Sequence, residues 1–211
     1  MSARKNAATA ATKTSPNEST LSGAAASADS AQRPCLVFAT NGSCEAHAAL
    51  HFASALAKRE ELVLRVVTVL EPLPALPTQQ IDAGYHMTVE MKRGESILDR
   101  VRADLSSSTT PPLVTCMLVG SPGATIAEAA REWNAEYVIL GAGRHGPIER
   151  LLTGDTVVRA LRHSIAPVIA VPSGRGALPR NGIVAVDFGE ASLAAARTAA
   201  TVIGEGILNI V

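Results

Sequence analysis

Three closely spaced glycines are the residues of this chain whose spacing most directly suggests chemistry. Gly141, Gly143 and Gly146 spell G-x-G-x-x-G, directly after the apolar run 138–140. In a dinucleotide-binding fold this pattern forms the first strand-to-helix turn, where backbone N–H groups approach a pyrophosphate. The pattern by itself fits a nicotinamide or flavin loop, another phosphate-binding loop, or a plain turn.

The surroundings of the glycines argue against a dinucleotide site. They follow the fourth strand-like run of the chain instead of the first, and Pro147, which has no backbone N–H, comes directly after Gly146. The acidic residue expected about 20 positions later is missing, because no Asp or Glu lies between Asp155 and Asp187. Composition alone would make the glycines turn residues.

Strand-like and helix-like segments alternate from Cys35 onward. The predicted strands are 35–40, 62–69, 113–119, 135–140 and 167–171. The predicted helices are one ending near Lys58, one with a buried stripe at Met87, Met91, Gly94, Leu98, Val101 and Leu105, one from Pro122 through Trp133, and one over 155–163. Continuous apolar strands between helices are typical of a sheet covered on both faces. We therefore predict an α/β fold with a doubly wound, five-stranded parallel sheet, a buried third strand, and a loop over 73–84.

The composition of the chain changes at both ends of this pattern. Residues 1–33 are rich in Ala, Ser and Thr and predict a disordered tail, residues 34–172 form the predicted domain, and 173–181 read as a linker. From 182 to 211 the opening pattern returns, with Asp187 in the place of Asn41. We expect 182–211 to be the start of a second, similar domain.

Composition and charge narrow the function classes. The formal net charge is zero and aromatic residues make up 3% of the chain, which argues against a nucleic-acid partner. No apolar run approaches the roughly 20 residues of a membrane span. The cysteines Cys35, Cys44 and Cys116 are odd in number and widely spaced, which excludes a disulfide framework, argues against a zinc site and fits a reducing cytoplasm. Cys35 and Cys116 lie in apolar runs and are expected to be packing thiols. No nucleophile elbow or catalytic triad is present in the sequence, so we expect no catalytic residues and, at most, a slow ATPase activity.

The order of several motifs resembles the universal stress protein family. These motifs are Asn41-Gly42-Ser43 after the first strand, V-G-S-P at 119–122, and the run I-L-G-A-G-R-H-G-P-I-E-R-L-L-T-G-D-T-V-V-R-A-L-R-H-S-I-A-P-V-I-A-V at 139–171. The resemblance extends over about 34–172 and again from 182 to the end. It implies the adenine nucleotide alpha hydrolase-like fold with strand order 3-2-1-4-5. It also implies a crevice beyond the carboxyl ends of strands one and four.

The resemblance also implies a set of nucleotide-binding positions. The ATP-binding members carry Gly, two residues, Gly, nine residues, Gly, then Ser or Thr. Gly141 and Gly154 match the first and third glycines, while Arg144 replaces the second. The Ser or Thr position is Asp155, and Thr156 follows it. Asn41 takes the place of the family's acid near the adenine, and Val69 matches the residue whose backbone faces it.

The replaced positions act on ATP in opposite directions. Asp155 caps the N–H groups that a phosphate needs and adds a negative charge beside a polyanion, unless Mg²⁺ bridges the two. Arg144 is a cation suited to phosphate, and the Thr156 hydroxyl can replace the missing one. Asn41 hydrogen-bonds without charge.

Three functions stay open at this point. The first is a cytoplasmic stress-response module that binds an adenine nucleotide, ATP with Mg²⁺. The second is a degenerate member that acts as a dimerisation or protein-interaction module without nucleotide. The third is a slow ATPase. The family dimerises through its fifth strand, which implies a homodimer or a tandem pseudo-dimer through residues 167–171.

Overall fold

The structure, a computed structural model, describes residues 33–72, 83–106, 111–142, 160 and 162–211. Its main sheet has five parallel strands in the order β3-β2-β1-β4-β5. The strands are β1 (Cys35–Ala39), β2 (Val63–Leu70), β3 (Leu113–Val119), β4 (Ala135–Ala142) and β5 (Val168–Pro172). The predicted fold class and strand order are confirmed.

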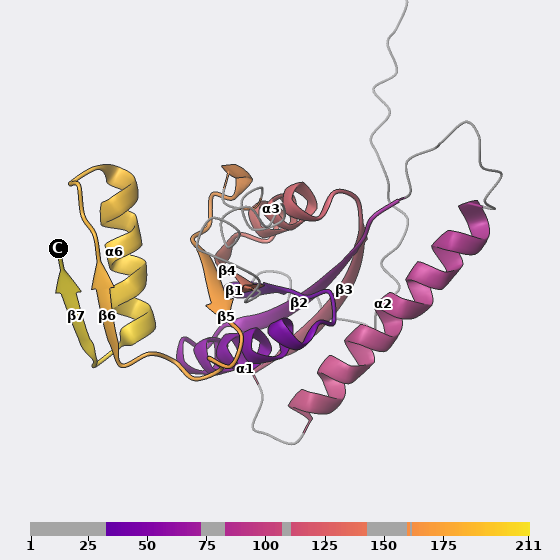
Figure 1. The fold of residues 1–211 in the computed structure, drawn as a ribbon, viewed down its shortest axis with the longest axis horizontal. Helices are drawn as coiled ribbons and strands as arrows, with labels where there is room; N and C mark the ends of the chain where they lie inside the picture. The colour runs from indigo at the N-terminus through magenta and orange to yellow at the C-terminus, as the bar shows by residue number, and fades with distance from the viewer. Residues whose placement is uncertain (1–32, 73–82, 107–110, 143–159, 161) are drawn as a thin grey trace, which may run out of the picture.

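Helices cover both faces of this sheet (Figure 1). In β1, Leu36 and Phe38 pack under α1 (Cys44–Arg59) and α2 (Ala83–Leu105), whereas Val37 and Ala39 pack under α3 (Pro122–Glu132). Successive side chains of a strand point to opposite faces, so a strand buried on both sides is apolar throughout. This explains the uninterrupted apolar run 35–39.

Two burial predictions were wrong. Met91 was expected in the buried stripe of α2, but its side chain is 37% exposed, and the buried positions are Gly94, Ile97, Leu98, Val101 and Leu105. The helix has 23 residues and spans about 34 Å, whereas the eight-residue strand β2 spans about 27 Å. The first turns of α2, which begins at Ala83 inside the predicted loop, therefore extend past the sheet (Figure 1). Strand β3 is half-buried because it is an edge strand that pairs with β2.

The buried strand β2 contains one cation. Arg65 is 7% exposed, and its guanidinium carbon lies 4.9 Å from the centre of the Trp133 ring. The aromatic face stabilises the buried charge. Burial raises the pKa of the neighbouring Cys35 and Cys116 thiols, against the opposing effect of Arg65. Both thiols therefore stay protonated at neutral pH.

A second β-α-β unit follows the main sheet. It consists of β6 (Asn181–Val184), α6 (Glu190–Ile203) and β7 (Ile207–Ile210), and its two strands pair in parallel. Strand β6 begins at the last residue of the predicted linker. Figure 1 shows the unit in yellow beside the first domain.

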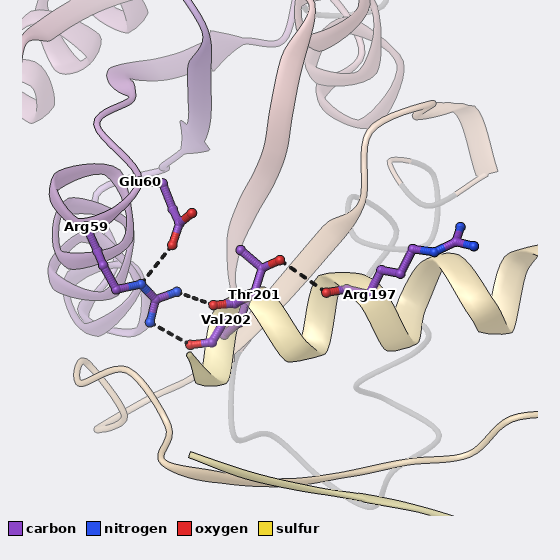
Figure 2. A network of polar contacts seen from close by, with 5 residues as sticks. All are labelled: Arg59, Glu60, Arg197, Thr201 and Val202. Atoms are coloured by element: carbon purple, nitrogen blue, oxygen red, sulfur yellow. Dashed lines mark hydrogen bonds and ion pairs between the residues drawn. The ribbon is translucent and has the colours of Figure 1, made fainter. Parts of the chain in front are cut away.

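The end of α6 is fastened to the first domain. The Arg59 guanidinium donates to the carbonyl of Val202 at 3.0 Å and to that of Thr201 (Figure 2). Val202 itself belongs to the core beneath α1, and Tyr137 of β4 hydrogen-bonds to Thr201. The last carbonyls of a helix lack partners within the helix and carry partial negative charge, so a cation there stabilises the end of the helix.

The small sheet has an uncovered face. Val184 and Ile203 are buried between the sheet and α6, whereas Ile183 and Ile207 on the opposite face are 75% and 64% exposed.

None of the helices in the described ranges is both long and apolar enough to cross a membrane.

Candidate functional site

The candidate site begins where β1 and β4 end side by side. Ala39 is level with Leu140 across the two strands, so Asn41 and Gly141 lie at the same edge of the sheet. The chain leaves these two strands in opposite directions along the sheet. After β1 it continues to β2 on one side, and after β4 it continues to β5 on the other side. Such a switch point is where open α/β sheets bind ligands.

Asn41 is held in a tight turn. Its Oδ1 accepts the Ser43 N–H at 3.0 Å, and Ser43 is the N-cap residue of α1. Gly42 has a φ of +76°, which glycine adopts without strain. The turn therefore holds Asn41 between the end of β1 and the start of α1, at the edge of the sheet.

A backbone acceptor lies beside this turn. The Thr40 N–H donates to the Val67 carbonyl and the Gly120 N–H to the Leu70 carbonyl, both at 2.9 Å. Alternate residues of β2 thus bond to β1 and to β3, so the Val69 carbonyl points toward β1, past its last paired residue. The Gly42 N–H, which would meet that carbonyl if β1 continued, donates to Thr40 Oγ1 instead, at 3.1 Å.

A cavity of about 220 Å³ opens at this place. Its walls come from the turn after β1, the end of β2, one side of α2 and the start of α3. The lining residues are Asn41, Thr68, Val69, Leu70, Glu71, Glu90, Arg93, Gly94, Ile97 and Pro122. Pockets that enclose whole ligands have about 300–1,000 Å³. This cavity therefore suits one ring system of a ligand whose remainder lies outside it.

Two glycines bring α2 close to the cavity. A Cβ on Gly42 would lie 2.7 Å from Ile97 Cγ1, and one on Gly94 would lie 3.2 Å from Leu70 Cδ2. These distances are shorter than ordinary van der Waals contact. The helix therefore packs directly on the turn after β1 and on the end of β2.

Across the described ranges, no group of three or more His, Cys, Asp or Glu side chains is placed to hold a metal ion.

Comparison with known families identifies the domain that contains the five-stranded sheet and its cavity. The sequence profile of the universal stress protein family matches residues 35–172, which is more than half of the chain. The chain belongs to the universal stress protein family. A Staphylococcus aureus (strain USA300) protein assigned to this family by name is 26% identical over 138 residues, which are 64% of this chain and 82% of that protein.

Solved structures of universal stress proteins share the fold. The protein UspA from Lactobacillus plantarum superposes with a TM-score of 0.56 at 20% identity, over 66% of this chain and 98% of that one. A universal stress protein in complex with cAMP gives 0.52 at 20% identity, over 68% and 99%. A longer one from Archaeoglobus fulgidus DSM 4304 gives 0.65 at 19% identity, over 85% of this chain and 66% of that one.

Within this universal stress domain, the structure brings together part of the predicted site. Asn41 and Val69 line the same cavity, and Gly141 is the second-to-last residue of β4, the strand next to β1, but is not among the cavity's lining residues. Arg144, Gly154, Asp155 and Thr156 fall outside the described residues, so their predicted roles stay predictions.

Sequence reasoning missed the contribution of α2. Glu90 and Arg93 line the cavity, yet in the sequence they look like ordinary residues of the solvent face. A signal was present, since Gly94 interrupts the large apolar residues of the stripe. A glycine inside a helix costs stability and suggests close packing.

Proposed function

We propose that this universal stress protein is a regulatory, non-catalytic module that binds an adenine nucleotide at the carboxyl edge of its sheet. The base enters the cavity between β2, α2 and Asn41. The ribose and phosphates extend along the edge toward Gly141 and the predicted phosphate residues Arg144, Gly154, Asp155 and Thr156. ATP with Mg²⁺ is the proposed form of the ligand, and the cytoplasm is the proposed location.

The observation that carries the proposal is the Val69 carbonyl. The alternation along β2 directs it toward β1, beyond the last paired residue, and Val69 lines the cavity there. The Gly42 N–H, which would meet this carbonyl if β1 continued, donates to Thr40 Oγ1 instead. A carbonyl in such a place can accept a hydrogen bond from the N–H of a bound molecule, because a backbone carbonyl is a strong acceptor that β1 does not use here. The 6-amino group of adenine supplies such an N–H.

The relatives support the same ligand class. The structural neighbour in complex with cAMP carries an adenine nucleotide on a fold that covers 68% of this chain. The cavity volume agrees with this class, since about 220 Å³ holds one ring system of such a ligand.

The second candidate function, protein interaction, draws on a different part of the molecule. Strand β5 is the edge of the main sheet, and Ile183 and Ile207 form an uncovered apolar face on the β6–β7 sheet. Both features favour association, since open edges and apolar faces attract partners. We propose pairing through β5, in a homodimer or with a complete second domain, as the accompanying role.

Isothermal titration with ATP and Mg²⁺ tests the nucleotide proposal. Saturable binding near one nucleotide per chain is expected for protein freed of bound nucleotide, with cAMP competing for the same site. The proposal is wrong if neither nucleotide produces heat or raises the unfolding midpoint.

An Asn41→Asp variant sharpens this experiment. A carboxylate at that position keeps an acceptor for the Ser43 N–H, as Asp187 does for the Gly189 N–H at 2.9 Å in the second unit. Charged acceptors form stronger hydrogen bonds than neutral ones, so the affinity for adenine nucleotide should rise about fivefold. Asn41→Ala should weaken it, and the same affinity in both variants would remove Asn41 from the site.

A further inference from the structure

Helix α2 carries an acid and a base side by side on the wall of the cavity. Glu90 and Arg93 lie one turn apart, and Arg93 Nη1 is 3.9 Å from Glu90 Oε1. The Glu90 side chain is 26% exposed and the Arg93 side chain 65%. At this separation the ion pair is weak, so both groups can turn to a ligand at little cost.

The position of the pair is set by the packing of the helix next to it. Gly94 follows Arg93 directly and is packed against Leu70 and Met117, and Ile97 lies one turn further on against Gly42. The helix therefore cannot move away from the cavity without opening these contacts. Glu90 and Arg93 therefore line the cavity from an element whose position is fixed by packing, which is what a specificity site needs.

The polar groups around the cavity have a definite pattern. The Val69 carbonyl and the Glu90 carboxylate are acceptors, and the Arg93 guanidinium is a donor. Glu71 also lines the cavity, so two acidic residues and one basic residue stand around it, and this end of the site disfavours phosphate and suits a neutral ring with N–H groups.

We propose that Glu90 and Arg93 determine which base this protein accepts, and that the accepted base is adenine. The adenine 6-amino group has two N–H donors, which meet the Val69 carbonyl and the Glu90 carboxylate. The neighbouring ring nitrogen N1 is an acceptor, which meets the Arg93 guanidinium. Hypoxanthine carries a carbonyl in place of the amino group, which sets oxygen against oxygen at Val69 and Glu90. The inference rests on the proposed nucleotide binding and adds the residues that select the base.

Titrations with ATP and ITP test the selection, because the two nucleotides differ in the base edge that the pair contacts. The native protein should bind ATP at least about tenfold more tightly than ITP, as expected for a hydrogen bond to a charged group. Glu90→Gln should reduce that ratio to about threefold or less, because the glutamine amide can donate to the ITP carbonyl. Glu95→Gln is the matched control, since Glu95 lies on the same helix, is exposed and is outside the cavity wall. That variant should keep the native ratio.

The possible outcomes separate this inference from the proposed function. If the native protein binds neither ATP nor ITP, both fall. If it binds ATP but binds ITP or GTP as tightly or more tightly, adenine selection is wrong while nucleotide binding stands. If Glu90→Gln keeps the full preference and its native urea midpoint, Glu90 does not select the base. A lowered ratio in Glu90→Gln alone, with Glu95→Gln unchanged, supports the inference.

Discussion

At the scale of single residues, the same turn is built twice from different side chains. Asn41 accepts the Ser43 N–H, and Asp187 accepts the Gly189 N–H and the Ser192 hydroxyl. The Ser192 and Gly189 hydrogen bonds hold the pKa of Asp187 below its ordinary value. The amide in the first unit and the carboxylate in the second therefore hold the same turn. Because the turn does not require a particular charge at position 41, a charge there would act on a bound ligand and not on the turn.

The sequence pointed to some of the residues that line the cavity and not to others. Asn41 and Val69 were expected there from the family resemblance, and both line the cavity, while their role in binding stays a prediction. Glu90 and Arg93 were not found, because charged residues are usual on the exposed side of any amphipathic helix. Their role depends on the direction in which α2 crosses the strand ends, and tertiary packing decides that direction.

Gly42 offers a stability test at this scale. Gly42→Ala places a side chain at a φ of +76° and 2.7 Å from Ile97 Cγ1, whereas Gly174→Ala has the same φ and no atom within 4 Å. Gly174→Ala should cost about 1 kcal/mol of backbone strain. Gly42→Ala should lower the free energy of unfolding by about 2–4 kcal/mol, because overpacking adds to the strain. Urea unfolding measures both, and equal costs would mean that α2 does not pack on the turn after β1.

At the scale of elements, the apolar runs predicted the sheet and the periodicity predicted most of each helix. Strands β1 to β5 lie within one or two residues of the segments expected from the sequence. The start of α2 at Ala83 and the exposure of Met91 were not predicted, because periodicity shows which side of a helix is apolar but not how far the sheet beneath it extends. The helix predicted over 155–163 falls mostly outside the described residues.

The contact between α1 and α6 gives the prediction at this scale. Arg59→Ala removes the donor to the last carbonyls of α6. Hydrogen exchange in 190–203 should become about tenfold faster, since a hydrogen bond to a charged group contributes about 1.5–3 kcal/mol and partial exposure reduces that value.

Arg100→Ala is the control for this exchange experiment. Arg100 is also exposed, and its guanidinium bonds within its own helix to the Ser96 carbonyl. Exchange in 190–203 should stay at the native rate in that variant. Native exchange rates in Arg59→Ala as well would show that the second unit does not depend on this contact.

At the scale of the whole molecule, the universal stress domain is followed by a small β-α-β unit, which we interpret as the start of a second, similar domain. The unit has the same parallel strand pairing and the same turn as the start of the first domain, but one face of its sheet is uncovered. The sequence predicts a repeat because the turn residues and the apolar runs recur in the same order, and this stays a prediction. How the unit is attached could not be predicted, because Arg59 and Val202 are 143 positions apart and nothing in the local sequence connects them.

The central claim for the molecule is that a nucleotide base lies between β2, α2 and Asn41. Amide chemical shifts in a titration with ATP and Mg²⁺ test both the binding and its location. The account predicts saturable shifts concentrated in 40–43, 68–71 and 90–97, with 181–211 unchanged. Shifts absent throughout, or confined to the second unit, would contradict it.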